Sequence, residues 1–484
     1  MSLSTLLSEP LWAFAALACG GLFALWLGTR RVVTRLEARL AQSDLEESSR
    51  IDLEEAHERS TATRAVIGLL AWLLPACVVT WSLVSGTPLQ RHLMDWAQLL
   101  VRWTHVIAGI MWIGASFYFI FLENHLERSR GVREELAGHL WAVHGGGFYH
   151  VEKYKGAPAR LPEKLHWFKY EAYFTWISGI SLLVLVYYTD ARMFLIDPNV
   201  AAVEAPVALA VALGSLVLGW SVYDLLCRSP LVERPRVFAF VGFALLCAMV
   251  FALTHLLSGR AAYLHVGAVI GTIMAGNVFF VIIPAQRALV RAARTGRQLD
   301  LQPGNRAGLR SLHNNYLTLP VVFTMISPHF PGTFAHPQRA LILIVLILAS
   351  AGIKHYWNLI ERGARRPWLL VASLLALISV SLAVAPTFEK PIASSANVPY
   401  ASAAAIIRDR CASCHSSHPT DDVFTTAPNG VMYDTPGQIQ GYAEQIMARA
   451  ITTESMPLAN KTSMTAEERR ILQQWILQGA RTDR

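Results

Sequence analysis

The chain has 484 residues, of which 53% are hydrophobic and only 16% are charged. A soluble protein of this length does not need so large an apolar fraction, so the composition indicates a membrane-embedded protein. The net charge is +8, and in a membrane protein such an excess of basic residues belongs first to cytoplasmic loops. We therefore expect a lipid bilayer, and no nucleic acid, around most of the chain.

Several apolar runs are long enough, or nearly so, to cross a bilayer, which takes about 20 residues in a helix. They lie at 11–29, 65–85, 97–122, 171–189, 205–227, 236–257, 262–285, 312–328, 339–358 and 367–386. The run at 312–328 is the weakest, because it is short and begins with polar residues. The pattern predicts an all-α fold, a polytopic transmembrane helix bundle of about ten spans.

The basic residues alternate between the two sets of connecting loops. One set carries most of them, whereas the opposite set carries only Arg91, Arg192, Arg260 and Arg339. The basic side is expected to be cytoplasmic, and an even number of spans then leaves both termini outside. Arg30 and Arg31 follow the first apolar run and do not precede it, which favours a retained helix over a signal peptide. We expect a multi-pass protein of a bacterial inner membrane, with the C-terminal segment in the periplasm.

The strongest motif is Cys411-Ala412-Ser413-Cys414-His415. Two cysteines spaced C-x-x-C and followed by histidine are the attachment signature of c-type haem. The thiols of Cys411 and Cys414 add to the two porphyrin vinyl groups, and His415 is placed to ligate the iron. Zinc and thiol-redox sites are the alternatives, but His415 and the lack of a second cysteine pair argue against both. The motif predicts covalent haem c.

The surrounding segment, from about Ala401 to Arg484, is expected to be a small helical domain. Thr465 and Glu468 form a capping-box pattern at the start of a last helix. The apolar face of that helix comprises Ile471, Leu472, Trp475, Ile476 and Ala480. The arrangement resembles class I cytochrome c, whose last helix crosses its first.

The second iron ligand should be a methionine thioether. Met456 is favoured, because Ser455-Met456-Pro457 lies between helical segments and resembles the Met-Pro of that family. Met432, Met447 and Met464 are the competitors. A methionine ligand raises the iron potential, which suits an electron acceptor.

Three histidines lie near the outer ends of predicted spans: His105, His255 and His265. Polar residues within spans are costly, so they indicate function. A pair of these histidines is expected to hold a b-type haem between helices. The alternative is that each one hydrogen-bonds a neighbouring helix.

Polar and aromatic residues also gather at the inner side. His144, His150 and Glu171 are candidates for the general base of catalysis. Candidate substrate-binding residues are Phe148 and Tyr149, which could stack on a planar ring, and Arg310, Asn314 and Asn315. The three glycines between His144 and Phe148 would let the backbone approach a ligand closely. The alternative is an ordinary interfacial belt of aromatic and basic residues.

Several longer motifs resemble the membrane-integral urate oxidase family. They are Arg102–Ile110, Trp112–Phe119, His144–His150, Glu171–Trp176, Gly259–Ala268 and Arg310–Pro320. That family joins a multi-span domain to a C-terminal cytochrome c, and the resemblance covers roughly 92–484. It divides the chain into additional N-terminal spans with a charged connector (1–91), a urate oxidase-type membrane domain (92–387), a linker (388–400) and the cytochrome c domain (401–484).

The resemblance implies oxidation of urate toward 5-hydroxyisourate, with electrons passed to the haem c and then to a terminal oxidase or a soluble cytochrome c. One haem takes one electron at a time, so an intermediate redox centre or two sequential transfers are required. If urate binds on the cytoplasmic side, a second centre should lie inward, with His313 or His355 as candidates; otherwise urate enters from the outer side. His144→Ala is expected to keep the haem spectrum and to lose urate-dependent reduction.

Two other classes of function fit parts of the sequence. A quinol-oxidising or other respiratory membrane cytochrome is one, although the chain lacks the adjacent His-His pair that a haem–copper oxidase needs. A transporter that tethers an electron carrier is the other, but no internal repeat supports it.

Overall fold

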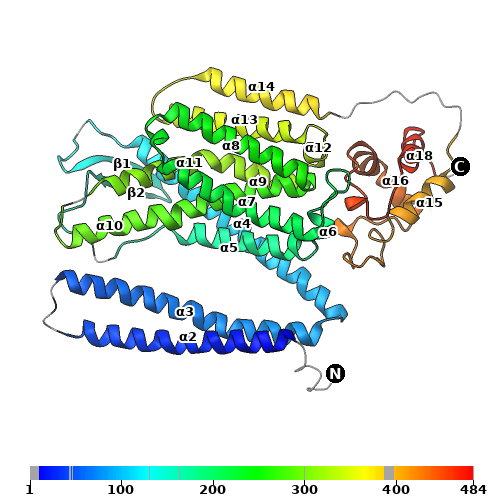
Figure 1. Cartoon of the computed structure of the whole chain (residues 1–484). Helices are drawn as coiled ribbons and strands as arrows, with labels where there is room; N and C mark the ends of the chain where they lie inside the picture. The colour runs from blue at the N-terminus through cyan, green and yellow to red at the C-terminus, as the bar shows by residue number, and fades with distance from the viewer. Residues whose placement is uncertain are drawn as a thin grey trace. The chain divides into compact units, whose positions relative to one another are not determined.

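The computed structural model describes residues 10–482, except 43, 44, 46, 130, 163, 299 and 386–396. The chain is 72% helix and 4% strand, so the predicted helical membrane protein is confirmed at this level (Figure 1). The strand content is one antiparallel hairpin, which the all-α prediction did not include. Two compact units are present, and the smaller comprises Met1–Leu99, Gly156–Lys164 and Gln286–Leu301.

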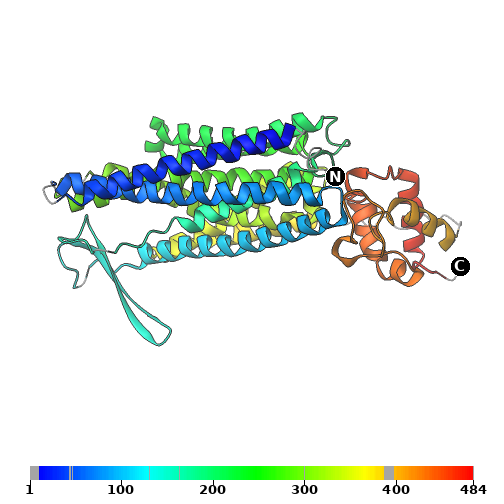
Figure 2. The same ribbon diagram turned by 90° about the horizontal axis from the view of Figure 1, so that it is seen from below.

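The smaller unit is built on α2 (Pro10–Leu40) and α3 (Glu47–Val84), two long helices that lie side by side in Figures 1 and 2. The charged connector, 30–64, is therefore mostly helical: it forms the end of α2 and the start of α3, and its described residues Ala41, Gln42 and Leu45 lie between the two helices. His57 Nε2 lies 3.3 Å from Glu37 Oε1 across the two helices. The Arg64 guanidinium lies over the Trp26 ring, 5.4 Å from its centroid. These contacts hold the pair together on its polar face.

The larger unit contains the remaining helices that could lie in a membrane, together with the hairpin. Their bounds are α4 (Pro88–His125, entering from the smaller unit), β1 (Leu136–His144), β2 (Gly147–Tyr154), α5 (Tyr170–Leu182), α6 (Ala191–Phe194), α7 (Ala205–Arg228), α8 (Pro235–Leu256), α9 (Gly259–Gly276), α11 (Gln302–Ile326), α12 (Pro331–Phe334), α13 (Arg339–Glu361) and α14 (Pro367–Ala383). The helix α10 (Ile283–Arg294) continues α9 through a π-helical segment, Asn277–Ile282. A second π-helical segment, Leu183–Tyr188, extends α5.

Among the described residues, seven helices are long and apolar enough to cross a membrane. All the predicted runs fall largely within helices, but α2, α11 and α14 are not among these seven. α14 has only 17 residues, and α11 carries buried polar residues and an internal proline. The structure therefore supports membrane embedding with fewer clear spans than the apolar runs suggested.

The helix α9 lies at the centre of the main core, and small residues allow its neighbours to approach. A Cβ on Gly267 would lie 2.2 Å from Thr324 Oγ1 of α11, and one on Gly259 would lie 2.1 Å from the Phe334 carbonyl oxygen. Tyr263, on the same helix, is fully buried and donates to the Arg339 carbonyl at 2.6 Å. The close packing of α9 thus depends on glycine at these positions.

Gly267→Ala is expected to destabilise the protein by about 1–3 kcal/mol, the usual cost of overpacking a close-packed core. The matched control is Gly271→Ala on the same helix, where no atom lies within 4 Å of the added Cβ. The thermal unfolding midpoint in detergent should fall for the first variant and stay at or above the wild-type value for the second. Equal midpoints for the two variants would contradict this packing of α9 on α11.

The C-terminal segment folds around its own core. Its helices are α15 (Tyr400–Arg410), α16 (Pro436–Gly441), α17 (Ala443–Ile446), the π-helical segment Met447–Thr452 and α18 (Ala466–Leu477). Most of the predicted linker, 388–396, lies outside the described residues. The first and last helices pack together, as predicted: Ile407, Leu472 and Trp475 are buried in one cluster. The predicted capping box is also confirmed, since the Thr465 side chain accepts from the Glu468 N–H and the Glu468 carboxylate accepts from the Thr465 N–H.

Candidate functional site

The predicted residues His144, Phe148, Tyr149 and His150 lie on the β1–β2 hairpin. Gly145 and Gly146, with φ of 57° and 81°, form its two-residue turn. Positive φ at both turn residues is what a tight hairpin needs, and glycine adopts it freely. A Gly-Gly step between two runs that contain aromatic and β-branched residues was the signal for this hairpin in the sequence. The glycines therefore turn the chain, and ligand approach is not needed to explain them.

The hairpin side chains are open to their surroundings. Phe148 is 80% exposed and Tyr149 53%. The His150 ring stacks on Trp141, with 4.3 Å between centroids. Figure 2 shows the cyan hairpin extending away from the helices of its unit. Glu171 lies elsewhere, in the first turn of α5, so the structure does not bring the proposed bases together, and their catalytic roles stay predictions.

Arg310, predicted to bind substrate, lies in a buried polar network inside the helices. Its guanidinium donates to Asp224 Oδ1 of α7 at 2.7 Å and to Asn277 Oδ1 at 3.1 Å. Asn277 begins the π-helical segment after α9, and its amide donates to Asn314 Oδ1 at 2.8 Å. Asn314 Nδ2 in turn donates to the Met274 carbonyl at 3.0 Å. The network joins α7, α9 and α11.

The same network reaches His313, one of the candidates for an inward redox centre. The Tyr223 hydroxyl lies 3.0 Å from Asn277 Nδ2 and 2.9 Å from His313 Nδ1. The His313 ring also stacks on Phe238, with 5.1 Å between centroids. Arg310 and Asn314 thus have protein partners for the groups that a substrate would use. The pairing indicates a structural role for the network, and substrate binding by Arg310 and Asn314 stays a prediction.

Asn315 faces a different set of partners, although it directly follows Asn314. Its Oδ1 accepts from Asn358 Nδ2 of α13 at 3.0 Å, while Asn315 Nδ2 and Asn358 Oδ1 are buried without any partner. One turn before Asn358, Lys354 is 4% exposed, and its Nζ lies over the Phe117 ring of α4 at 4.0 Å. We call Lys354, Asn358, Asn315 and Phe117 the lysine–amide cluster. The sequence prediction contained only Asn315; a lysine inside the apolar run of α13 was the signal for the rest.

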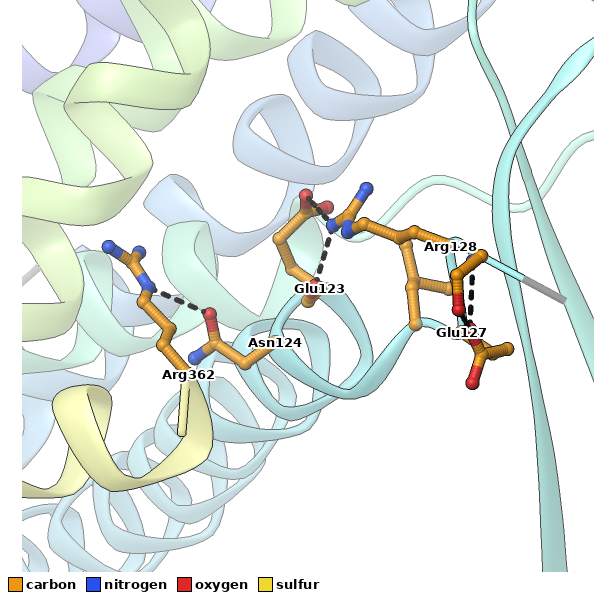
Figure 3. A pocket seen from close by; sticks show the side chains of 7 residues that line it. Glu123, Asn124, Glu127, Arg128 and Arg362 are labelled. Atoms are coloured by element: carbon orange, nitrogen blue, oxygen red, sulfur yellow. Dashed lines mark hydrogen bonds and ion pairs between the residues drawn. The ribbon is translucent and has the colours of Figure 1, made fainter. Parts of the chain in front are cut away.

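A surface cavity of about 490 Å³ opens at the ends of α4 and α13 (Figure 3). Asn124 bridges the two helices: its Nδ2 donates to Glu361 at 2.7 Å, and its Oδ1 accepts from Arg362 Nε at 3.1 Å. On the other side, Arg128 pairs with Glu123 at 3.0 Å. Arginine side chains therefore line this opening, one helical turn beyond Asn358.

The three outer histidines each have hydrogen-bond partners nearby. His105 Nδ1 donates to the Thr175 carbonyl at 3.0 Å, and His255 Nδ1 donates to the Phe251 carbonyl at 2.7 Å. The Nε2 atoms of His105 and His255 therefore keep a lone pair, which a metal ligand needs. The buried His265 donates from Nδ1 to Ala261 and accepts at Nε2 from the Tyr188 hydroxyl at 3.1 Å. His265 therefore has a protein partner at each ring nitrogen, and b-type haem ligation by a pair of these three histidines stays a prediction.

The Cys411–His415 motif follows directly on α15. Neither Cys411 nor Cys414 forms a disulfide, and burial raises the pKa of the Cys411 thiol to about 12. Thiol-redox motifs need a lowered cysteine pKa, so this pair does not fit that class. No group of three or more His, Cys, Asp or Glu that could hold a metal ion occurs among the described residues, so a zinc site at the two cysteines lacks further ligands.

The residues at this motif fit the attachment of haem c. His415 Nδ1 donates to the Val431 carbonyl at 3.0 Å, which fixes the ring and leaves Nε2 free for iron. Burial also lowers the pKa of His415, which favours the neutral imidazole, the form that ligates metals. Cys411 packs against the apolar core of the C-terminal segment. This apolar surrounding suits the apolar edge of a porphyrin.

The loop that carries Met456 is anchored at its backbone. The Met456 N–H donates to the Arg449 carbonyl at 3.0 Å, and its carbonyl accepts from the buried Arg469 at 2.9 Å. Arg469 also donates to the Ala450 carbonyl. Of the competing methionines, Met464 is 3% exposed within the core, where its thioether already packs against protein. Met456 therefore stays the preferred second ligand.

Comparison with known proteins gives one match. The family model described as urate oxidase N-terminal matches residues 91–385, more than half of the chain. No curated protein and no solved structure matches the chain.

Proposed function

The chain belongs to the urate oxidase N-terminal family, and from this premise we propose that it oxidises urate toward 5-hydroxyisourate in the membrane and passes the electrons to its own haem c. The observation that carries the proposal is the union, in one chain, of this family domain with a folded segment that presents Cys411, Cys414 and an oriented His415. Neither part alone would link purine oxidation to electron transfer.

The haem would be held by thioether bonds to Cys411 and Cys414, with His415 and Met456 as the iron ligands. When bound, it supplies a one-electron acceptor. The protein's own contribution is to fix these ligands, through the Val431 carbonyl for His415 and through Arg469 for the Met456 loop. A downstream terminal oxidase or soluble cytochrome c would then reoxidise the protein.

The substrate chemistry sets what the membrane domain must provide. Urate is a planar anion near neutral pH, and its conversion adds one water and releases two protons and two electrons. The site must therefore hold an anion, pack against a flat ring and keep the reacting face away from bulk water. We place urate among the helices of the larger unit, and we place the protein in a bacterial inner membrane with its C-terminal segment in the periplasm.

The test is anaerobic reduction of the purified, oxidised full-length protein by urate, followed through the absorption bands of reduced haem c. Because urate gives two electrons and each haem accepts one, one urate should reduce two haem groups. The same protein should be mixed in parallel with a reduced quinone. Reduction by the quinol but not by urate would overturn the proposal and favour a respiratory quinol-oxidising cytochrome.

A further inference from the structure

The lysine–amide cluster contains a buried lysine that has no direct ion pair with a described residue. Lys354 makes no hydrogen bond or ion pair with any described residue. Its ammonium lies over the Phe117 ring, and the carboxylate whose charge acts on it is Glu361, seven residues further along α13, which accepts from Asn124. A charged side chain within the membrane is costly and is usually paired, or faces a cavity or pathway. A cation–π contact offsets only a small part of that cost. The ammonium of Lys354 is therefore left without a directly bonded anion, a place that the anion of a ligand would take.

The two amides beside Lys354 add a free donor and a free acceptor. Asn315 and Asn358 are 0% and 3% exposed, and they make one hydrogen bond with each other. Asn315 Nδ2 and Asn358 Oδ1 have no partner. If both amides were turned over, their roles would exchange, and one donor and one acceptor would still be free. Buried polar atoms of this kind are normally satisfied, so a ligand with an adjacent acceptor and donor fits them.

The helices place the cluster along one seam. Lys354 meets Phe117, and seven residues later on both helices Glu361 meets Asn124. This repeat shows that α4 and α13 run parallel in this region, with Asn315 contributed by α11. The cavity at the helix ends (Figure 3), with Arg362 at its rim, lies one turn beyond Asn358. Arg128 and Arg362 line that cavity together with Glu123 and Glu127, so guanidinium groups are present where an anion would approach this end.

We propose that Lys354, Asn358, Asn315 and Phe117 form the binding site for the urate anion, an inference that rests on the proposed function. The ammonium of Lys354 balances the negative charge. The free amide N–H and C=O pair with a lactam C=O and N–H on the purine edge, and Phe117 offers an aromatic surface to the flat ring. Arg310 and Asn314 instead hold the neighbouring helices in place.

The test is equilibrium binding of radiolabelled urate to the full-length protein in detergent, with hypoxanthine as an uncharged purine probe. Lys354→Met should weaken urate binding by about tenfold or more, the usual effect of losing a charge-assisted hydrogen bond, and should leave any weak hypoxanthine binding unchanged. Asn358→Asp has almost the same shape but gives Lys354 a carboxylate, so it should weaken urate binding at least as strongly. Lys155→Met, at an exposed lysine, is the control.

Two outcomes separate this inference from the proposed function. If Lys354→Met and Asn358→Asp, each with a wild-type unfolding midpoint, bind urate as tightly as the wild type, the lysine–amide cluster is not the site, although urate oxidation by the chain stands. If urate binds in a Lys354-dependent way but does not reduce the wild-type protein without oxygen, the binding site stands and the oxidation fails.

Discussion

Replacing Cys411 and Cys414 together by serine is expected to abolish covalent haem and, with it, all urate-dependent reduction of the protein. Thioether attachment needs a sulfur at each position, and a serine hydroxyl cannot replace it. The measurement is haem-dependent peroxidase staining of the denatured chain after electrophoresis, which detects only haem that is covalently bound. The wild type should stain and the double variant should not.

The control is a double variant of two other free cysteines, Cys227→Ser with Cys247→Ser, which should stain like the wild type. Persistent staining of the Cys411/Cys414 variant would show that the haem is attached elsewhere. A wild-type protein that never stains would remove the haem c assignment. The raised pKa of Cys411 would then count against a redox dithiol as its replacement.

Local patterns of the sequence were enough to predict the last helix of the C-terminal segment and its capping box. The capping box at Thr465 and Glu468 needs only residues three apart, and the apolar face of α18 repeats at helical spacing. The apolar runs likewise located the long helices, because burial in lipid leaves a continuous signal. Each of these features depends on residues that lie close together in the sequence.

The hairpin and the polar interior could not be obtained in the same way. The hairpin was missed because the glycines at 145–147 were interpreted as a close approach to a ligand. The aromatic and β-branched residues on both sides of Gly145-Gly146 were the signal for two strands. The pairing of Arg310 with Asp224 joins residues 86 apart, and no local pattern specifies such a contact. The free amide atoms of Asn315 and Asn358 depend on the packing of α11 on α13, which only the folded chain shows.

Asp224→Ala is expected to cost about 3–5 kcal/mol of stability, because it leaves the buried Arg310 without its carboxylate. Arg310 is 5% exposed, and its bond to Asp224 Oδ1 is 2.7 Å long. The measurement is the thermal unfolding midpoint of the detergent-solubilised protein, together with the amount recovered from membranes. Both should fall sharply.

Arg228→Ala provides the matched control, because Arg228 pairs with the other oxygen of Asp224 at 2.7 Å but is 71% exposed. Exposed pairs contribute only about 0–1 kcal/mol, so this variant should stay close to the wild type.

Combining Asp224→Leu with Arg310→Met removes both buried charges and should recover most of the lost stability. If the double variant is as unstable as Asp224→Ala, the loss comes from helix packing and not from an uncompensated guanidinium. If instead its stability returns but urate-dependent reduction does not, Arg310 has a role in the reaction beyond holding α7, α9 and α11 together.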